Sequence, residues 1–94
     1  KALYNADVLL TDKVISMNDK VDKKKKSKKF KNFKITNKLI KYGKKNLTVL
    51  HCLPRGDEID EKVFNKFKEY IWKQAHNRIC VQKSILLYCL NKLR

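Results

Sequence analysis

The chain has 94 residues, a formal net charge of +15 and an isoelectric point near 9.9. A chain of this length forms one small domain at most, and such a domain buries only about 60–65% of the surface that it exposes when unfolded. Its three widely spaced cysteines argue against a disulfide framework and a metal site, and no apolar run is long enough for a membrane span.

The first predicted element is a buried strand over residues 6–10, preceded by a segment compatible with a helix end that stops at Asn5. The run is apolar without alternation, which is typical of a parallel strand covered on both faces. Thr11 and Asp12 follow at its carboxyl end. Residues 15–19 then form a turn-like loop, in which Asn18 can adopt a left-handed conformation.

A lysine-rich helix is predicted next, capped by Asp19 or Asp22 and running to about Phe33, with Phe30 on the same face. Together with the residues around it, it is long enough for the crossover between two parallel strands. The lysines of this segment lie at positions 23–26, 28, 29, 31 and 34. They form either a phosphate-binding stripe for nucleic acid or a solvated face, and the lack of interleaved aromatics and of a known reader motif favours the solvated face.

A second buried strand is predicted over residues 47–50, after a short helix over 37–42 that Thr36 caps and Gly43 ends. His51 and Cys52 follow this strand, and Pro54 makes the chain leave it stiffly. Ligands of open α/β sheets bind just outside the carboxyl ends of strands. The thiol, the imidazole and the nearby guanidinium group of Arg55 therefore indicate a site, although a plain packing role for the His-Cys pair is the alternative.

The carboxyl-terminal third is predicted to hold two helices. Asp60 caps the first, over residues 61–67, whose apolar face is formed by Val63, Phe64 and Phe67. Residues 70–72 are predicted as a short strand or extended segment, and residues 74–78 as a polar loop.

Asn77 caps the second of these helices, over residues 78–92. Residues 85–90 are apolar around most of its circumference. We therefore expect this helix to be covered on more than one side by a missing neighbour, either the rest of a longer chain or another subunit.

Three segments resemble the carbamoyltransferases, and among them most closely the ornithine carbamoyltransferases. Residues 6–12 with Ile-Ser-Met at 15–17 resemble the family's strand and its mobile loop, and His-Cys-Leu-Pro-Arg at 51–55 matches the ornithine branch directly. The aspartate branch usually has proline where Cys52 stands. Further matching residues follow in the same order: Glu58, Asp60, Val63, Phe64, Ala75, Asn77 and Arg78.

The resemblance implies an α/β fold, part of a Rossmann-like parallel-sheet domain with flanking helices and a long carboxyl-terminal helix. It implies transfer of the carbamoyl group of carbamoyl phosphate to the δ-amine of L-ornithine, giving citrulline and phosphate, without a metal or cofactor. Asp12 would bind the α-amino group of ornithine, and Ser16 and Met17 would contact ornithine from the closing loop.

The remaining roles also come from the resemblance. Cys52 would lie against the reacting amine as a catalytic residue, as proton acceptor if its thiol pKa is lowered. Cys52 and Leu53 would line the carbamoyl phosphate site through backbone groups. Arg78 would bind the carbamoyl oxygen, where negative charge develops. The family usually has tryptophan at the position of Val14 and glycine at that of Asn18.

The family's phosphate-binding Ser-Thr-Arg-Thr and His-Pro-x-Gln segments do not occur in this sequence. Family members are much longer and form trimers. We therefore expect residues 1–94 to be part of the carboxyl-terminal, ornithine-binding domain of a cytoplasmic or mitochondrial enzyme, without its amino-terminal domain and inactive alone. The alternatives are a non-catalytic basic module of the same fold that binds nucleic acid or an anionic surface, and a truncated product that does not fold stably.

Overall fold

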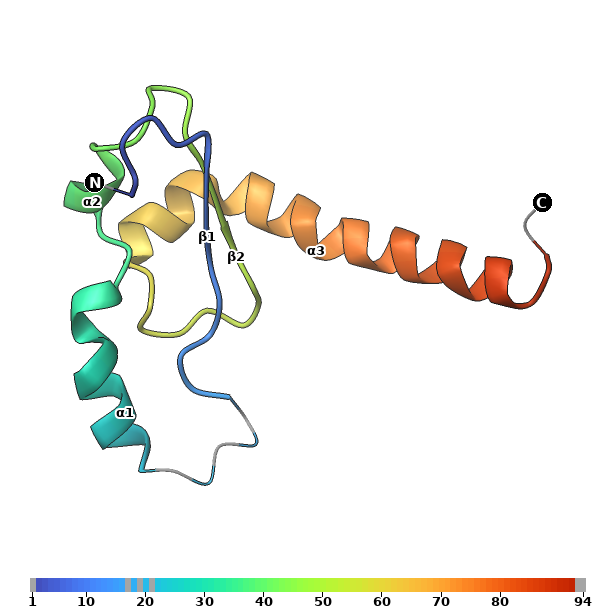
Figure 1. Cartoon of the computed structure of the whole chain (residues 1–94), viewed down its shortest axis with the longest axis horizontal. Coiled ribbons are helices and arrows are strands. Elements are labelled where there is room, and N and C mark those ends of the chain that lie inside the picture. Colours follow the sequence, from blue (N-terminus) through green and yellow to red (C-terminus); the bar gives the residue numbers. More distant parts are fainter. Residues whose placement is uncertain (1, 17, 19, 21, 93–94) are drawn as a thin grey trace.

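The computed structural model of the chain describes residues 2–16, 18, 20 and 22–92. Strands β1 (Val8–Thr11) and β2 (Thr48–His51) pair in parallel in a two-stranded sheet, with Val8 opposite Thr48 and Thr11 opposite His51 (Figure 1). This pairing confirms the predicted α/β fold with a parallel sheet. The elements in chain order are β1 (Val8–Thr11), α1 (Lys23–Phe30), the 3₁₀ helix η1 (Lys31–Phe33), α2 (Asn37–Ile40), β2 (Thr48–His51) and α3 (Glu61–Cys89).

The crossover between the strands carries both predicted helix caps. The side chain of Asp22 accepts a hydrogen bond from the Lys24 N–H at 3.0 Å, whereas the alternative cap, Asp19, lies outside the described residues. Thr36 Oγ1 accepts from the Leu39 N–H at 3.1 Å and starts α2. Both helices end earlier than expected: α1 tightens into η1, and α2 stops at Ile40.

The core lies between β2 and the first half of α3. Val63, Phe67 and Ile71 are buried at intervals of four residues, so that one face of α3 rests on the strand. An isolated bridge between Ile35 and Ile59 joins the end of the crossover to the loop that follows β2. The buried apolar residues are Ile35, Ile40, Leu47, Val49, Ile59, Val63, Phe67 and Ile71.

The carboxyl-terminal region is one helix rather than two. The predicted extended segment at 70–72, the loop at 74–78 and the cap at Asn77 are wrong, because α3 runs without a break over 29 residues. Only Ile71 of the apolar triplet is buried, while Tyr70 and Trp72 are 53% and 60% exposed. The segment contains no glycine or proline, so nothing in its backbone opposes the helix that burial of Ile71 favours.

Strand β1 is covered on one face only. Leu9 packs against the core, but Val8 and Leu10 on the opposite face are 55% and 62% exposed. The prediction of a strand buried on both faces is therefore wrong for this structure. The reason is that none of the described residues forms a layer over that side of the sheet.

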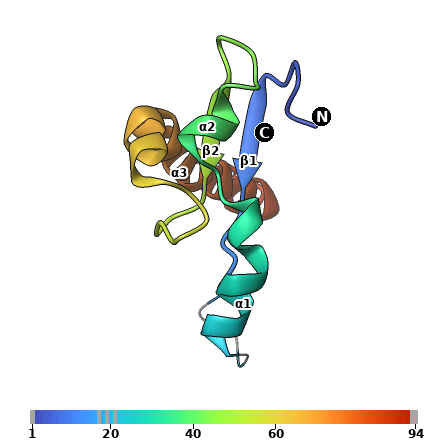
Figure 2. The same cartoon turned by 90° about the vertical axis from the view of Figure 1, so that its left-hand side faces the viewer.

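The distal half of α3 extends away from the body of the molecule (Figures 1 and 2). The radius of gyration is 16.4 Å, whereas a compact domain of this length would have about 12 Å. The exposed apolar residues of this half are Ile79, Val81, Ile85, Leu86, Leu87, Tyr88 and Leu90. As expected, the described part of the chain does not cover this apolar helix. Among the described helices, none combines the length and the apolar character needed to cross a bilayer.

Candidate functional site

The site begins where the two parallel strands end. Thr11 pairs with His51, so the next residue of each strand, Asp12 and Cys52, emerges at the same edge of the sheet. The Cys52 thiol donates a hydrogen bond to Asp12 Oδ1, with 3.2 Å between sulfur and oxygen. The Lys13 N–H donates to the same oxygen at 2.7 Å. The structure thus brings together the two residues that sequence analysis placed at adjacent strand ends.

Asp12 and Cys52 shift each other's ionisation in opposite directions. The hydrogen bond from the Lys13 N–H, followed by that from the Cys52 thiol, holds the pKa of Asp12 below its ordinary value. Partial burial, followed by the Asp12 carboxylate, raises the pKa of the Cys52 thiol. In this arrangement Cys52 is a protonated donor, and the condition for a thiolate base, a lowered pKa, is not met.

His51, the last residue of β2, forms a buried hydrogen-bonded pair with Glu58. His51 Nε2 lies 2.7 Å from Glu58 Oε1, and the two side chains are 0% and 5% exposed. The other ring nitrogen, Nδ1, contacts the backbone carbonyl oxygen of Cys52. Both neighbours of the ring are oxygen acceptors, and these two contacts fix the orientation of the ring next to Cys52.

Glu58 is held as a carboxylate by its surroundings. Burial raises the pKa of its carboxyl group, but the backbone N–H groups of Glu58 and Gly56 and the His51 ring outweigh burial and bring the pKa below its ordinary value. The Gly56 N–H donates to Glu58 Oε1 at 2.8 Å. A Cβ atom at Gly56 would lie 2.6 Å from Glu58 Oε2, so this close approach requires glycine.

The segment between Cys52 and Glu58 lies against the start of α3. Leu53 packs on the core, and the Leu53–Pro54 peptide bond is cis. Arg55 contacts the start of α3 and the residue before its cap: its Nη1 donates to the Ile59 carbonyl oxygen at 3.3 Å, and its guanidinium group lies 5.9 Å from the ring centroid of Phe64. Arg55 therefore stabilises this turn.

The other predicted site residues are not gathered at this edge. Ser16 is exposed on the loop after β1, and Met17 lies outside the described residues. Arg78 is exposed on α3, seven residues beyond the last buried position, Ile71, which is about 10 Å along the helix axis. Within the described chain its guanidinium group makes no hydrogen bond or ion pair, so the structure does not join it to Asp12 and Cys52.

The sequence patterns do not predict the pairing of His51 with Glu58. The signal available was a carboxylate seven residues after a histidine that follows a buried strand, with the intervening turn closed by Pro54 and Gly56. That signal is weak, because the loop conformation decides whether the two side chains meet. Among the described residues, no group of three His, Cys, Asp or Glu side chains could hold a metal ion.

Comparisons with known proteins agree with the geometry. A family model described as "Aspartate/ornithine carbamoyltransferase, Asp/Orn binding domain" matches residues 1–89. The chain is 45% identical over 93 residues to an ornithine carbamoyltransferase of Methanococcus vannielii, and the match covers 96% of this chain and 30% of that protein. A relative of the same name from Methanocaldococcus jannaschii is 39% identical, with 98% of this chain and 31% of that protein covered.

A solved structure shows the same fold. The crystal structure of the anabolic ornithine carbamoyltransferase of Campylobacter jejuni matches with a TM-score of 0.87 and 38% identity, over 97% of this chain and 31% of that one. The chain thus spans about a third of the length of the relatives that it matches. The chain belongs to the aspartate/ornithine carbamoyltransferase family, in which it matches the Asp/Orn-binding domain.

Proposed function

We propose that this chain is the ornithine-binding part of an ornithine carbamoyltransferase. The full protein would transfer the carbamoyl group of carbamoyl phosphate to the δ-amine of ornithine and release citrulline and phosphate. The observation that carries the proposal is the meeting of Asp12 and Cys52 at the carboxyl ends of β1 and β2. It is supported by relatives named ornithine carbamoyltransferase.

Asp12 is proposed to bind the α-ammonium group of ornithine. Like any exposed aspartate it is negatively charged at neutral pH, its lowered pKa extends this charge to more acidic pH, and its carboxylate can be reached by a ligand. A charge-assisted hydrogen bond to an ammonium group is the interaction for which such a carboxylate is suited. Ser16 and Met17 are proposed to contact ornithine from the following loop.

Cys52 is proposed to contact the reacting amine, with Leu53 beside it on the carbamoyl phosphate side. Without a ligand, the Asp12 carboxylate disfavours the thiolate. An ornithine ammonium group bound to Asp12 would neutralise that carboxylate and add positive charge nearby, and both changes lower the thiol pKa. Proton acceptance by Cys52 would therefore depend on bound ornithine.

Arg78 is proposed to bind the carbamoyl oxygen in the complete site, which a further domain or subunit would close. The exposed apolar residues of β1 and of the distal half of α3 support such a neighbour. The proposed full protein has an amino-terminal domain for carbamoyl phosphate and assembles as a trimer, as the resemblance implies.

A chimeric enzyme tests this function. The chain replaces the corresponding third of the Campylobacter jejuni enzyme, to which it is 38% identical, and citrulline formation is measured. Arg78→Ala should lower kcat about 10²- to 10³-fold if the Arg78 guanidinium group binds the developing oxyanion. Asp12→Asn should raise KM for ornithine and leave KM for carbamoyl phosphate nearly unchanged.

The control variant is Lys83→Ala, another exposed cation on α3, which should leave both constants unchanged. An active chimera whose kcat is insensitive to Arg78→Ala would remove the role of Arg78. An active chimera whose KM for ornithine is insensitive to Asp12→Asn would remove the role of Asp12.

A further inference from the structure

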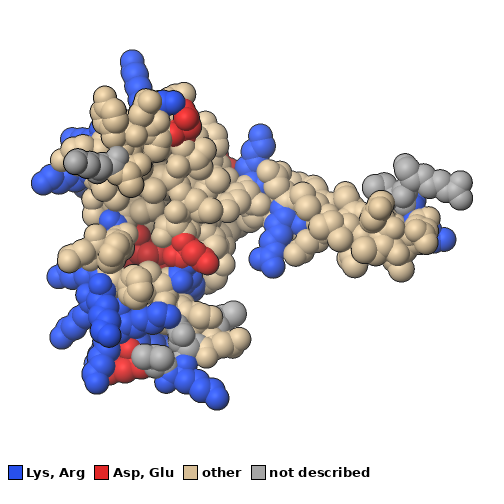
Figure 3. Space-filling view, viewed as in Figure 1, with Lys and Arg blue, Asp and Glu red and all other residues tan. Residues whose placement is uncertain are grey.

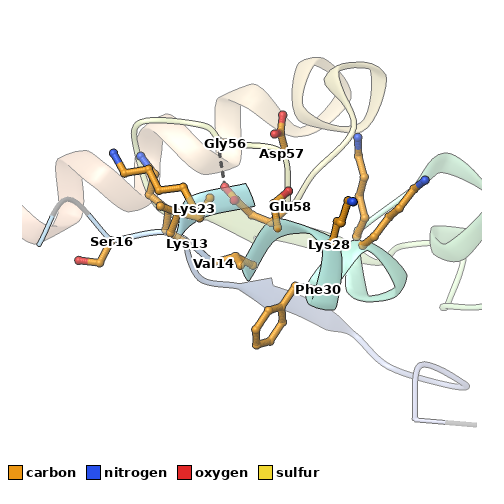
Figure 4. Close-up of a pocket in the computed structure, with 13 residues that line it drawn as sticks. Lys13, Val14, Ser16, Lys23, Lys28, Phe30, Gly56, Asp57 and Glu58 are labelled. Carbon is orange, nitrogen blue, oxygen red and sulfur yellow. Dashed lines mark hydrogen bonds between the residues drawn. The ribbon is translucent and has the colours of Figure 1, made fainter. Parts of the chain in front are cut away.

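A second concave site lies beside the strand ends, between the loop after β1, helix α1 and the loop after β2 (Figure 4). Its volume is about 490 Å³, within the range of small-molecule sites. Asp12, Cys52 and Arg78 are not among its lining residues. It is therefore separate from the residues proposed for carbamoyl transfer, except for Ser16 at its edge.

The rim of this pocket is strongly basic. Five lysines line it: Lys13, Lys23, Lys28, Lys31 and Lys34. Lys34 is paired with Asp60 at 3.0 Å, and of the two acidic lining residues Glu58 is already engaged with His51. In the described part of the chain, no carboxylate forms an ion pair with Lys23, Lys28 or Lys31.

The lysines of α1 do not all face the pocket. Lining positions 23, 27, 28, 30, 31 and 34 recur at helical spacing along one side of α1 and η1. Lys25 and Lys29, four residues apart, are not lining residues and lie on another side. Figure 3 shows the accumulation of lysines over α1, compared with the largely uncharged distal part of α3. Only some of the lysines of α1 therefore line the pocket.

The pocket also has an apolar wall and one exposed carboxylate that can accept a hydrogen bond. Val14, Ile15 and Phe30 line it; Phe30 is 43% exposed, and its ring centroid lies 5.9 Å from that of Phe33. An aromatic ring offers a stacking surface to a flat ligand group. Asp57, on the loop after β2, is exposed and can accept a hydrogen bond from a ligand O–H or N–H.

We infer that this pocket binds a nucleoside phosphate. The phosphates would lie against Lys23, Lys28 and Lys31, since ammonium groups bind phosphate as point charges. The base would lie against Phe30 and the neighbouring aliphatic residues, and Asp57 would accept from a hydroxyl or amino group. Neither a bare inorganic anion nor a purely apolar ligand would use both halves of the pocket.

The test measures binding of ATP, inorganic triphosphate and a short single-stranded oligonucleotide to the full chain by calorimetry. We expect ATP to bind more tightly than triphosphate. Lys28→Gln with Lys31→Gln should raise the Kd for ATP about fivefold, since each exposed charge contributes modestly. The matched control, Lys25→Gln with Lys29→Gln, removes the same charge from the same helix and should change the Kd by less than about twofold.

A second variant distinguishes the contribution of the apolar wall to ATP binding from that of the lysine charges. Phe30→Ala should raise the Kd for ATP and leave the Kd for triphosphate unchanged. The inference is overturned if ATP does not bind, if triphosphate binds as tightly as ATP, or if both lysine pairs weaken binding equally, which would indicate diffuse surface attraction. It is also overturned if only the oligonucleotide binds, which would favour a nucleic-acid surface on α1.

Discussion

At the scale of residues, the thiol of Cys52 and the carboxylate of Asp12 form the chemical centre of the candidate site. Burial is the larger cause of the raised pKa of Cys52, and the hydrogen bond and charge of Asp12 add to it. The hydrogen bonds that Asp12 accepts from the Lys13 N–H and the Cys52 thiol lower the pKa of its carboxyl group. The unliganded pair is therefore a thiol and a carboxylate, not a thiolate.

Neutralising Asp12 should make Cys52 more reactive at lower pH. Asp12→Asn removes the nearby negative charge, so the thiol pKa falls, and the rise of alkylation rate with pH moves to lower pH. The measurement is the pH dependence of Cys52 alkylation by iodoacetamide, in a background of Cys80→Ser and Cys89→Ser, because both of those cysteines are exposed. Asp57→Asn is the matched control, and an unchanged profile in Asp12→Asn would exclude the proposed coupling.

The His51–Glu58 pair should contribute stability that depends on pH. The folded-state pKa of Glu58 lies below the ordinary value of 4.5, so its stabilisation is present above about pH 4.5 and is lost as pH falls through the folded-state pKa. Glu58→Gln should lower the free energy of unfolding by about 1–3 kcal/mol at pH 7, because it replaces the carboxylate that is hydrogen-bonded to His51 and to the Gly56 N–H.

Urea unfolding of the variant and the unchanged chain at pH 7 and at pH 3 measures this contribution. The difference between the two proteins should shrink at the lower pH. Asp57→Asn, beside it on the surface, should stay within about 0.5 kcal/mol of the unchanged chain. An equal difference at both pH values would mean that the carboxylate charge contributes nothing.

At the scale of elements, α3 is a single helix with two different environments. Its first half supplies the buried residues Val63, Phe67 and Ile71, and these hold β2 in place. Its distal half continues the helix with exposed apolar residues. Helical propensity and the absence of breakers maintain the helix there, because packing within the described chain does not.

Truncation of two aliphatic residues on α3 should therefore have very different effects. Ile71→Ala, at a fully buried position, should lower the free energy of unfolding by about 2–5 kcal/mol. Leu86→Ala, at a position 62% exposed, should change it by about 0.5 kcal/mol or less. Urea titration followed by circular dichroism measures both, and a cost at Leu86 equal to that at Ile71 would show that the distal half packs against a second copy in solution.

At the scale of the whole molecule, the chain contributes one side of the candidate site, and part of its sheet and of α3 is left uncovered. The sheet has two strands, one of which exposes Val8 and Leu10, and α3 extends beyond the core. The chain spans about a third of the length of its relatives. The proposed site for two substrates would therefore require surfaces beyond those that the described residues supply.

The chain alone should produce no citrulline from ornithine and carbamoyl phosphate. The Ser-Thr-Arg-Thr and His-Pro-x-Gln segments, which the family resemblance associates with carbamoyl phosphate, are absent from the sequence. Citrulline is measured by mass spectrometry, with the Campylobacter jejuni enzyme as positive control. Turnover by the purified chain that disappears in Asp12→Asn would contradict this prediction.

The sequence by itself determined the two strands, the cap at Thr36, a cap at Asp19 or Asp22 for the lysine-rich helix, and the adjacency of Asp12 and Cys52. Apolar runs and capping side chains act over a few residues, and parallel strands place their carboxyl ends at one edge. The same local reasoning failed at residues 70–78. There, three apolar residues resembled a strand, although only one of them is buried.

Tertiary structure alone decided the continuity of α3, the exposed face of β1, the pairing of His51 with Glu58 and the outward position of Arg78. Each depends on which segments pack together, since burial at Ile71 selects the helix and closure of the loop after β2 brings Glu58 to the ring. Local patterns specify what a segment prefers, but contacts distant in sequence decide which of its faces is buried and which side chains meet.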